Sequence, residues 1–356
     1  MKRRELLGGA ATLVALGGCA GPRIDPGQSP VATGAPLRSI AFGSCIDQNR
    51  PAPIWDTIVA GRPDLFVFGG DNVYCEMPYS RARLRRAYAL AAESPGMNRL
   101  RRSVPHLAIW DDHDYGANDG GAEFAFKAES KAEFLDFWKL PATDQRHGRE
   151  GLYHAQVSGP AGQRLQVILL DERWFRSPWK PTDQRNAPGK ERYVADADPA
   201  KTMLGDAQWQ WLEQQLRQPA EVRLIVSGVQ VVTEGHGWER WGNFPRERER
   251  LYRLIGSTGA QGVVFLSGDR HVGALYREAS GTAYPLHEMT SSGMTHPWRD
   301  AAEAGPNRLG ELFTDVHYGT VDIDWEAGGL SLSIRDIAGK AQREARISFN
   351  QLKVQS

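Results

Sequence analysis

Three aspartates surround one histidine in the segment Ile109-Trp-Asp-Asp-His-Asp114. Carboxylates this close repel one another and raise one another's pKa, so a folded protein tolerates them mainly where a cation or a reaction uses them. The apolar residues 106–110 are typical of a short buried strand, and ligands bind at the carboxyl edge of open α/β sheets. The segment therefore indicates a metal or catalytic site, although a solvated acidic loop would also explain it.

Residue types that bind metals also follow four other apolar runs. They are Cys45 and Asp47 after residues 37–44, Asp71 and Tyr74 after residues 64–69, Gln230 after residues 222–227, and Asp269 and His271 after residues 262–267. Parallel or mixed sheets bring the carboxyl ends of their strands to one rim. Carboxylates, thiolates and imidazoles are common metal ligands. The sequence therefore predicts one metal centre assembled from the ends of separate strands.

Helical patterns alternate with these strands. The sequence predicts helices at residues 53–59, 81–92, 123–138, 205–216 and 246–255, and late strands at residues 284–289, 319–324 and 330–335. Strands interleaved with helices, followed by a β-rich tail, favour a layered α/β domain of two packed sheets with helices outside. Residues 174–202 are too long for a simple turn and indicate a functional or lid-like loop.

Aromatic residues are concentrated in several polar segments. Of the 11 tryptophans, Trp174, Trp179, Trp238, Trp241 and Trp298 lie in such segments. They suggest loops packed by aromatic side chains around a cleft, although plain loop packing would also explain most of them.

The composition indicates a globular protein and argues against a nucleic-acid binder. The chain has 356 residues, of which 41% are hydrophobic, which is ample for a buried core. Lys+Arg and Asp+Glu are equal at 43 each. There is consequently no overall field to recruit nucleic acid or an anionic membrane.

The first residues have the pattern of an export signal. Arg3 and Arg4 precede an uncharged stretch from Leu6 to Gly18, which is too short to span a bilayer and resembles a twin-arginine signal. The sequence Leu16-Gly-Gly-Cys19 resembles a lipobox, so we expect Cys19 to be lipidated after residues 1–18 are removed. Residues 19–36 form a linker. We therefore expect the twin-arginine export machinery as a partner and a periplasmic or cell-surface lipoprotein, held to the membrane by its lipid alone.

At this point several motifs resemble one family. Gly70-Asp-Asn-Val-Tyr74 matches the Gly-Asp-x-x-Tyr element of purple acid phosphatases. Ser44-Cys45, Trp110-Asp-Asp-His-Asp-x-x-x-Asn118, Leu170-Asp-x-Arg173 and Ser267-Gly-Asp-Arg-His271 resemble the signature of the alkaline phosphatase D (PhoD-like) family of calcineurin-like metallophosphoesterases. The resemblance implies a four-layer α/β/β/α sandwich of two mixed sheets over residues 37–356. Because Cys19 lies close to the first strand, we expect no room for the additional N-terminal β-sandwich of many members.

The resemblance also implies the ligands of two metals. Asp71 would bridge them, with Cys45, Tyr74 and His271 on one metal and Asp112, Asp269 and Gln230 on the other. Thiolate, phenolate and imidazole suit Fe3+, whereas an oxygen-only set suits Ca2+. Asp47 and Asn118 would hold a further calcium.

The implied activity is the hydrolysis of phosphate esters, mono- or diesters, by a hydroxide that the two metals activate. His113 would stabilise the transition-state charge or protonate the leaving group. Arg173 and Arg270 are candidates for phosphate contacts, although an arginine among aspartates is as often a structural ion-pair partner.

Several alternatives stay open. Cys45 and Cys75 could form a disulfide in an oxidising compartment. The enzyme could be a phosphodiesterase of phospholipase D type, or the chain could be a catalytically inactive binding lipoprotein of the same fold. We interpret His106 as a core histidine. We leave the histidines without a partner motif as surface or structural residues, with His236 as a possible pocket residue; they are His147, His154, His236, His287, His296 and His317.

Overall fold

Two mixed β-sheets form the centre of the structure, a computed structural model that describes residues 34–75 and 77–354. The first sheet has the order β12-β11-β10-β1-β2-β3 and the second β4-β5-β6-β7-β9-β8. The first sheet contains β1 (Ser39–Gly43), β2 (Leu65–Gly69), β3 (His106–Ile109), β10 (His317–Asp324), β11 (Gly329–Asp336) and β12 (Ala341–Ser348). The second contains β4 (His154–Ser158), β5 (Leu165–Leu169), β6 (Val222–Ser227), β7 (Val263–Ser267), β8 (Gly273–Glu278) and β9 (Leu286–Ser291).

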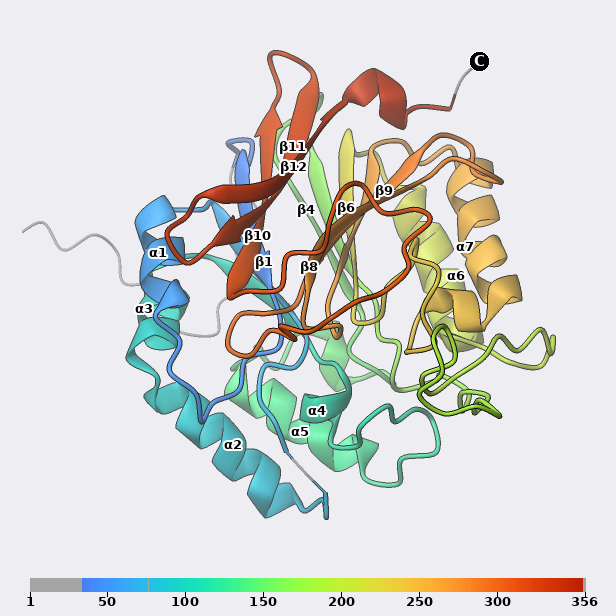
Figure 1. Cartoon of the computed structure of the whole chain (residues 1–356). Coiled ribbons are helices and arrows are strands. Elements are labelled where there is room, and N and C mark those ends of the chain that lie inside the picture. The colour runs from blue at the N-terminus through green and yellow to red at the C-terminus, as the bar shows by residue number, and fades with distance from the viewer. Residues whose placement is uncertain (1–33, 76, 355–356) are drawn as a thin grey trace, which may run out of the picture.

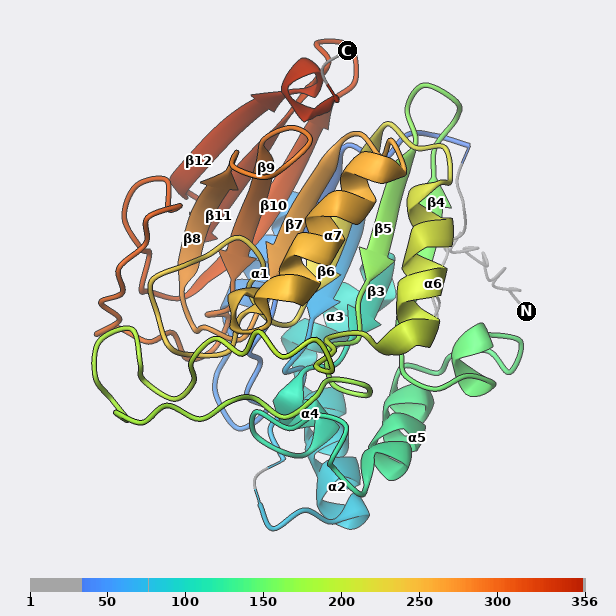
Figure 2. The same ribbon diagram turned by 90° about the vertical axis from the view of Figure 1, so that its right-hand side faces the viewer.

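Helices cover the outer face of each sheet (Figures 1 and 2). The helices are α1 (Ile54–Gly61), α2 (Arg81–Glu93), α3 (Pro95–Ser103), α4 (Asp112–Tyr115), α5 (Lys127–Phe137), α6 (Gly205–Leu216) and α7 (Pro245–Ser257). α1, α2 and α3 lie beside the first sheet, and α6 and α7 lie against the second. The sheets contact one another through β9 with β10 and β11, and through β8 with β12. The α/β/β/α layering predicted from the sequence is confirmed.

The strands that lead to the predicted ligands are parallel and buried. β1, β2 and β3 run parallel to one another, as do β5, β6, β7 and β9. Every residue of β2, β5, β6 and β7 is buried. Parallel strands covered on both faces have continuous apolar sequences, which is why these runs were recognisable in the sequence.

One predicted helix starts later than its pattern suggested. α5 begins at Lys127 rather than at residue 123, and Phe124 lies in the preceding turn. The Phe124 ring packs there against Tyr79 and Tyr115, with ring centroids 5.2 Å away in each case. The partial burial of Phe124 therefore reflects an aromatic cluster and not a helical face.

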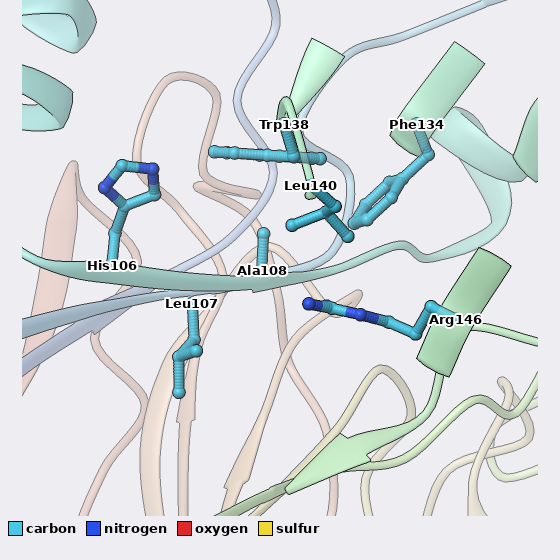
Figure 3. A pocket seen from close by; sticks show the side chains of 7 residues that line it. All are labelled: His106, Leu107, Ala108, Phe134, Trp138, Leu140 and Arg146. Atoms are coloured by element: carbon cyan, nitrogen blue, oxygen red, sulfur yellow. The ribbon is translucent and has the colours of Figure 1, made fainter. Parts of the chain in front are cut away.

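His106 lines a small cavity beside β3 (Figure 3). His106 and Ala108 project from the strand toward Trp138, and Leu107 projects to the opposite side. The His106 side chain is buried, and its ring centroid lies 5.6 Å from that of Trp138. These contacts agree with its interpretation as a core histidine.

The structure also addresses the predictions for the cysteines and the export signal. Cys45 and Cys75 are both buried thiols, and no disulfide joins them. The predicted signal at residues 1–18, the lipidation site Cys19 and the linker up to residue 33 lie outside the described residues. Within residues 34–75 and 77–354, no helix is long and apolar enough to cross a membrane.

Candidate metal centre

The carboxyl ends of strands from both sheets meet beside α4, in the lower part of Figure 1. Cys45 follows β1, Asp71 follows β2, and Asp112 follows β3 in the first sheet. Asp269 and His271 follow β7 of the second sheet. Since the strands are parallel within each sheet, their ends share one rim, and the site is built from both sheets.

The backbone at this rim is strained. Cys45, Asp71, Asp269 and His271 have left-handed φ angles of 60°, 49°, 66° and 55°, half of the eight non-glycine residues with positive φ in the described ranges. Such conformations cost energy and are retained at functional sites. The chain also passes so close to itself here that a Cβ on Gly70 would lie 2.5 Å from Cβ of Asp111.

Asp71 lies at the centre of the predicted ligands. Its Oδ2 is 3.4 Å from Sγ of Cys45 and 3.4 Å from the hydroxyl oxygen of Tyr74. Its Oδ1 accepts a hydrogen bond of 3.2 Å from the backbone N–H of His113. Asp71 thus contacts neighbours from β1 and from α4, a position that suits a carboxylate shared by two cations.

Burial and nearby negative charge disfavour the ionised forms of Cys45, Tyr74 and Asp71. Burial raises the pKa of the Cys45 thiol, and the carboxylates of Asp71 and Asp269 raise it further. Burial, then Cys45 and Asp71, raise the pKa of Tyr74. Burial raises the pKa of Asp71, and Asp112 raises it further. A bound cation would offset these costs, because it favours the deprotonated form of each ligand.

His271 is oriented as a neutral ligand. Its Nδ1 donates a hydrogen bond of 3.0 Å to the carbonyl oxygen of His296, which leaves Nε2 to bind a metal. Burial, then the neighbouring His296, lower the pKa of His271 to about 3, so the ring is neutral at pH 7. The ring centroids of His296 and Tyr74 lie 4.4 Å and 6.5 Å from that of His271.

Three overlapping acidic clusters share Asp112. The clusters are Asp71–Asp112–His113, Asp111–Asp112–Asp269 and Asp112–Asp119–Glu239, each with ligand atoms within 4.8 Å of one another. Asp111 Oδ2 and Asp112 Oδ1 are buried and have no hydrogen-bond partner within the described residues. Buried carboxylate oxygens without partners are costly. This donor set therefore fits a hard, oxygen-binding cation.

The two candidate arginines are both engaged by acidic groups. Arg173 is fully buried, and its Nε lies 2.6 Å from Asp111 Oδ1. Its two terminal nitrogens each lie 2.8 Å from a carboxylate oxygen of Glu239. Arg270 is buried and paired with Glu303. The contacts of Arg173 favour the interpretation as an ion-pair partner that holds Asp111 in place.

The structure places the other predicted ligands differently. Gln230 is buried; its Nε2 donates to Thr290 at 2.8 Å and its Oε1 accepts from His236 at 2.9 Å. Asp47 Oδ2 pairs with Nε of Arg50 at 3.0 Å, outside the three clusters, and Asn118 is exposed. A ligand role for these three residues remains a prediction.

Sequence reasoning missed Asp119, Glu239 and His296. Asp119 directly follows the quoted motif and also has a positive φ of 54°, and its backbone N–H donates to Asp112 Oδ2 at 2.7 Å. Glu239 and His296 lie in loops, and the ring centroid of His296 is 4.8 Å from that of Tyr74. Only Asp119 carried a signal, because it directly follows the quoted motif; the other two reach the site through tertiary packing.

With this geometry established, the comparisons identify the family. The sequence profile described as PhoD-like phosphatase matches residues 40–303. The chain belongs to the PhoD-like phosphatase family. It is 23% identical over 213 residues to alkaline phosphatase D of Bacillus subtilis, a match that covers 52% of this chain and 34% of that protein.

The chain is also similar to another curated protein and to solved structures. The chain is 29% identical over 163 residues to "Probable inactive purple acid phosphatase 14" of Arabidopsis thaliana, covering 41% of this chain and 38% of that protein. The chain thus matches little more than a third of the length of these curated relatives. The solved structure titled "Structure of PhoD" has a TM-score of 0.66 at 16% identity and covers 91% of this chain and 70% of that one. Purple acid phosphatase PPD1 of yellow lupin has a TM-score of 0.57 at 12% identity, covering 92% and 55%. At such identities these structures show the shared fold.

Proposed function

We propose that this member of the family hydrolyses phosphate esters at a two-metal centre built around Asp71. The position of Asp71 carries the proposal, since its Oδ2 lies 3.4 Å from both Cys45 Sγ and the Tyr74 hydroxyl while its carboxylate also clusters with Asp112. A buried carboxylate shared between a thiol, a phenol and further carboxylates has little structural use without cations.

The donor set divides the centre into two parts. Cys45, Tyr74 and His271 would hold Fe3+, and Asp112 with Asp269 would hold Ca2+, with Asp71 between them. Bound cations would neutralise phosphate oxygens and lower the pKa of a water molecule, which supplies the nucleophile. Asp47 and Asn118 stay candidates for a further calcium, and Gln230 for the second metal.

His113 is the proposed catalytic residue of the chain. Its backbone is fixed by Asp71, and its ring centroid lies 4.1 Å from that of Tyr74. The side chain is half-buried, so it can reach both the centre and an entering substrate. From this position we propose that it donates a proton to the leaving alkoxide or stabilises the charge of the transition state.

The two arginines would act differently. Arg173 is a positioning residue, because its guanidinium is occupied by Asp111 and Glu239 inside the protein. Arg270 lies between the candidate ligands Asp269 and His271 in the chain and could contact the ester group.

The test uses the exported protein supplied with iron and calcium. Metal content and the visible spectrum are measured first, and turnover is then measured on p-nitrophenyl phosphate and on its bis ester. We expect both metals, a tyrosinate-to-iron band that Tyr74→Phe removes, and turnover that His113→Ala abolishes at unchanged metal content. Preference for the bis ester would favour the phospholipase D-type alternative. Protein that binds no metal would leave the inactive binding lipoprotein, a possibility that the name of the Arabidopsis relative keeps in view.

We also propose that the chain is exported and anchored. Residues 1–18 would be the twin-arginine signal, Cys19 the lipidated residue, and residues 37–356 the phosphatase domain, with residues 19–36 as a linker. Support comes from the sequence pattern alone. Mass spectrometry of membrane-extracted protein should find a diacylglycerol on Cys19, and replacing Arg3 and Arg4 with lysine should leave the precursor uncleaved. A signal peptide cleaved elsewhere, or cytoplasmic protein of full length, would contradict the proposal.

A further inference from the structure

A group of stacked aromatic and basic side chains lies directly beside the candidate metal centre. We call Arg192, Trp238, Arg270 and Trp298 the aromatic rim. They come from four different segments: the long insert after β5, the loop after β6, and the loops after β7 and after β9. Nothing in the proposed metal chemistry uses the two tryptophans.

Hydrogen bonds tie the aromatic rim to the candidate ligands. The backbone N–H of Trp298 donates to the carbonyl oxygen of His271 at 2.7 Å. NH1 of Arg192 pairs with Asp119 Oδ2 at 2.7 Å, and Asp119 in turn donates its backbone N–H to Asp112 Oδ2. The rim is therefore held at a fixed position relative to both halves of the centre.

The side chains of the rim stack on one another. The guanidinium carbons of Arg192 and Arg270 lie 4.8 Å and 4.9 Å from the ring centroid of Trp238. The rings of Trp238 and Trp298 meet edge to face, with centroids 5.8 Å apart. Trp238 is half-buried under these contacts, whereas 37% of Trp298 is exposed. Trp298 is thus the ring that a ligand can reach.

The charge of the rim is already balanced within the protein. Arg192 pairs with Asp119, and Arg270 pairs with Glu303. The rim consequently offers a supported π-surface rather than an uncompensated positive charge. Such a surface favours a flat, uncharged group through stacking, whereas a second anionic group would gain little there.

From this arrangement we infer that Trp298 binds the organic group of the ester and favours planar aromatic groups, such as aryl or nucleoside esters. The inference rests on the proposed function, because the phosphate must lie at the metal centre for its organic group to reach the rim. Trp298 would determine specificity, while Trp238 would hold it in place.

The experiment compares Trp298→Ala and Trp298→Phe with the wild type on 1-naphthyl phosphate and on glycerol 2-phosphate. Each variant is compared with the wild type on the same ester, so the differing reactivity of the two leaving groups cancels. Trp298→Ala should lower kcat/KM for the naphthyl ester about tenfold, mainly through KM, and change that for the glycerol ester less than about twofold. Trp298→Phe should restore most of the loss. Trp211 lies on α6 and packs against Tyr153, so Trp211→Ala is the matched control. It should leave kcat/KM for both esters unchanged.

A binding measurement separates this inference from the proposed function. Calorimetry on the metal-loaded protein compares phenylphosphonate with methylphosphonate, and Trp298→Ala should weaken only the former. Equal losses on both esters, or no loss on either, would overturn the role of Trp298. Wild-type protein that hydrolyses neither ester would overturn the proposed function instead. The binding measurement would then still test the rim, because equal affinity for the two phosphonates would overturn the aromatic preference.

Discussion

The sulfur of Cys45 lies 3.4 Å from Oδ2 of Asp71, across the ends of the parallel neighbours β1 and β2. Both residues have left-handed backbone angles, and both side chains are buried. Burial raises the pKa of each group, and each would repel the other if both were ionised. The protein therefore holds two acidic groups together at an energetic cost that a shared cation would offset.

Replacing Cys45 should remove one metal. Cys45→Ala is expected to lose bound iron and the visible absorption band while keeping the fold, since the cavity it leaves is small. Metal analysis and absorption spectroscopy on protein loaded identically would measure this. Cys75→Ala is the matched control, because Cys75 is also a buried thiol. Equal iron in both variants would argue against Cys45 as a ligand.

Metal removal should destabilise the protein through the acidic clusters. Asp111 Oδ2 and Asp112 Oδ1 are buried without hydrogen-bond partners among the described residues, and Arg173 is the only arginine paired with either carboxylate there, so the cation-free state leaves an excess of buried negative charge. At free metal about 100-fold above its Kd, binding should add about 2.7 kcal/mol to the free energy of unfolding. Thermal unfolding with calcium and with chelator would measure the shift in Tm. In Asp112→Asn the shift should shrink strongly; a full shift in that variant would place the cation elsewhere.

The strands leading to the site could be predicted, including the edge strand β3, whereas the other three edge strands could not. β2, β6 and β7 are buried along their length, so their apolar runs stand out and the ligands follow at once. β4, β8 and β12, which were not foreseen, are all edge strands. β12 reads Ala341-Gln-Arg-Glu-Ala-Arg-Ile-Ser348, and of these residues Ile347 alone is buried. Polar, charged edges protect a sheet from further pairing and carry little hydrophobic pattern.

The site shows the same division. Asp71 and Asp112 were predictable, because each lies within three residues of the end of a buried strand. Glu239 is a different case, since it meets Arg173 across 66 residues of sequence. Its role depends on how the loop after β6 folds back onto the candidate metal centre. No local pattern of residues encodes such a contact.

Removing the buried arginine should cost far more stability than removing an exposed one. Arg173→Ala would remove the closest cationic partner of Asp111 and two hydrogen bonds to Glu239 inside the protein, and breaking such a buried pair costs about 3–5 kcal/mol. Arg217→Ala breaks an exposed pair with Glu213 and should change stability by less than about 1 kcal/mol. Urea unfolding of the metal-loaded proteins would compare them. If Arg173→Ala instead kept its stability and raised KM, Arg173 would contact the phosphate.

His106 should make stability depend on pH below neutrality. Burial lowers the pKa of His106 to about 4 in the folded protein, against about 6.5 in an unfolded chain. Between these values the unfolded state binds a proton that the folded state does not, so the free energy of unfolding rises as pH rises from 4 to 6.5. Relative to high pH, this single group lowers the free energy of unfolding by about 3 kcal/mol at pH 4 and by only about 0.4 kcal/mol at pH 6.5.

The variant His106→Phe isolates this contribution from that of the other buried histidines. Phenylalanine keeps the ring contacts with Phe68 and Trp138 but cannot take up a proton. Urea unfolding at pH 4.5, 5.5 and 7 should therefore give the variant a flatter profile than the wild type. His147→Gln, at an exposed position, should follow the wild-type profile. Parallel profiles for His106→Phe and the wild type would mean that His106 is protonated as easily in the folded chain as in the unfolded one, so that opening around β3 admits water to the ring.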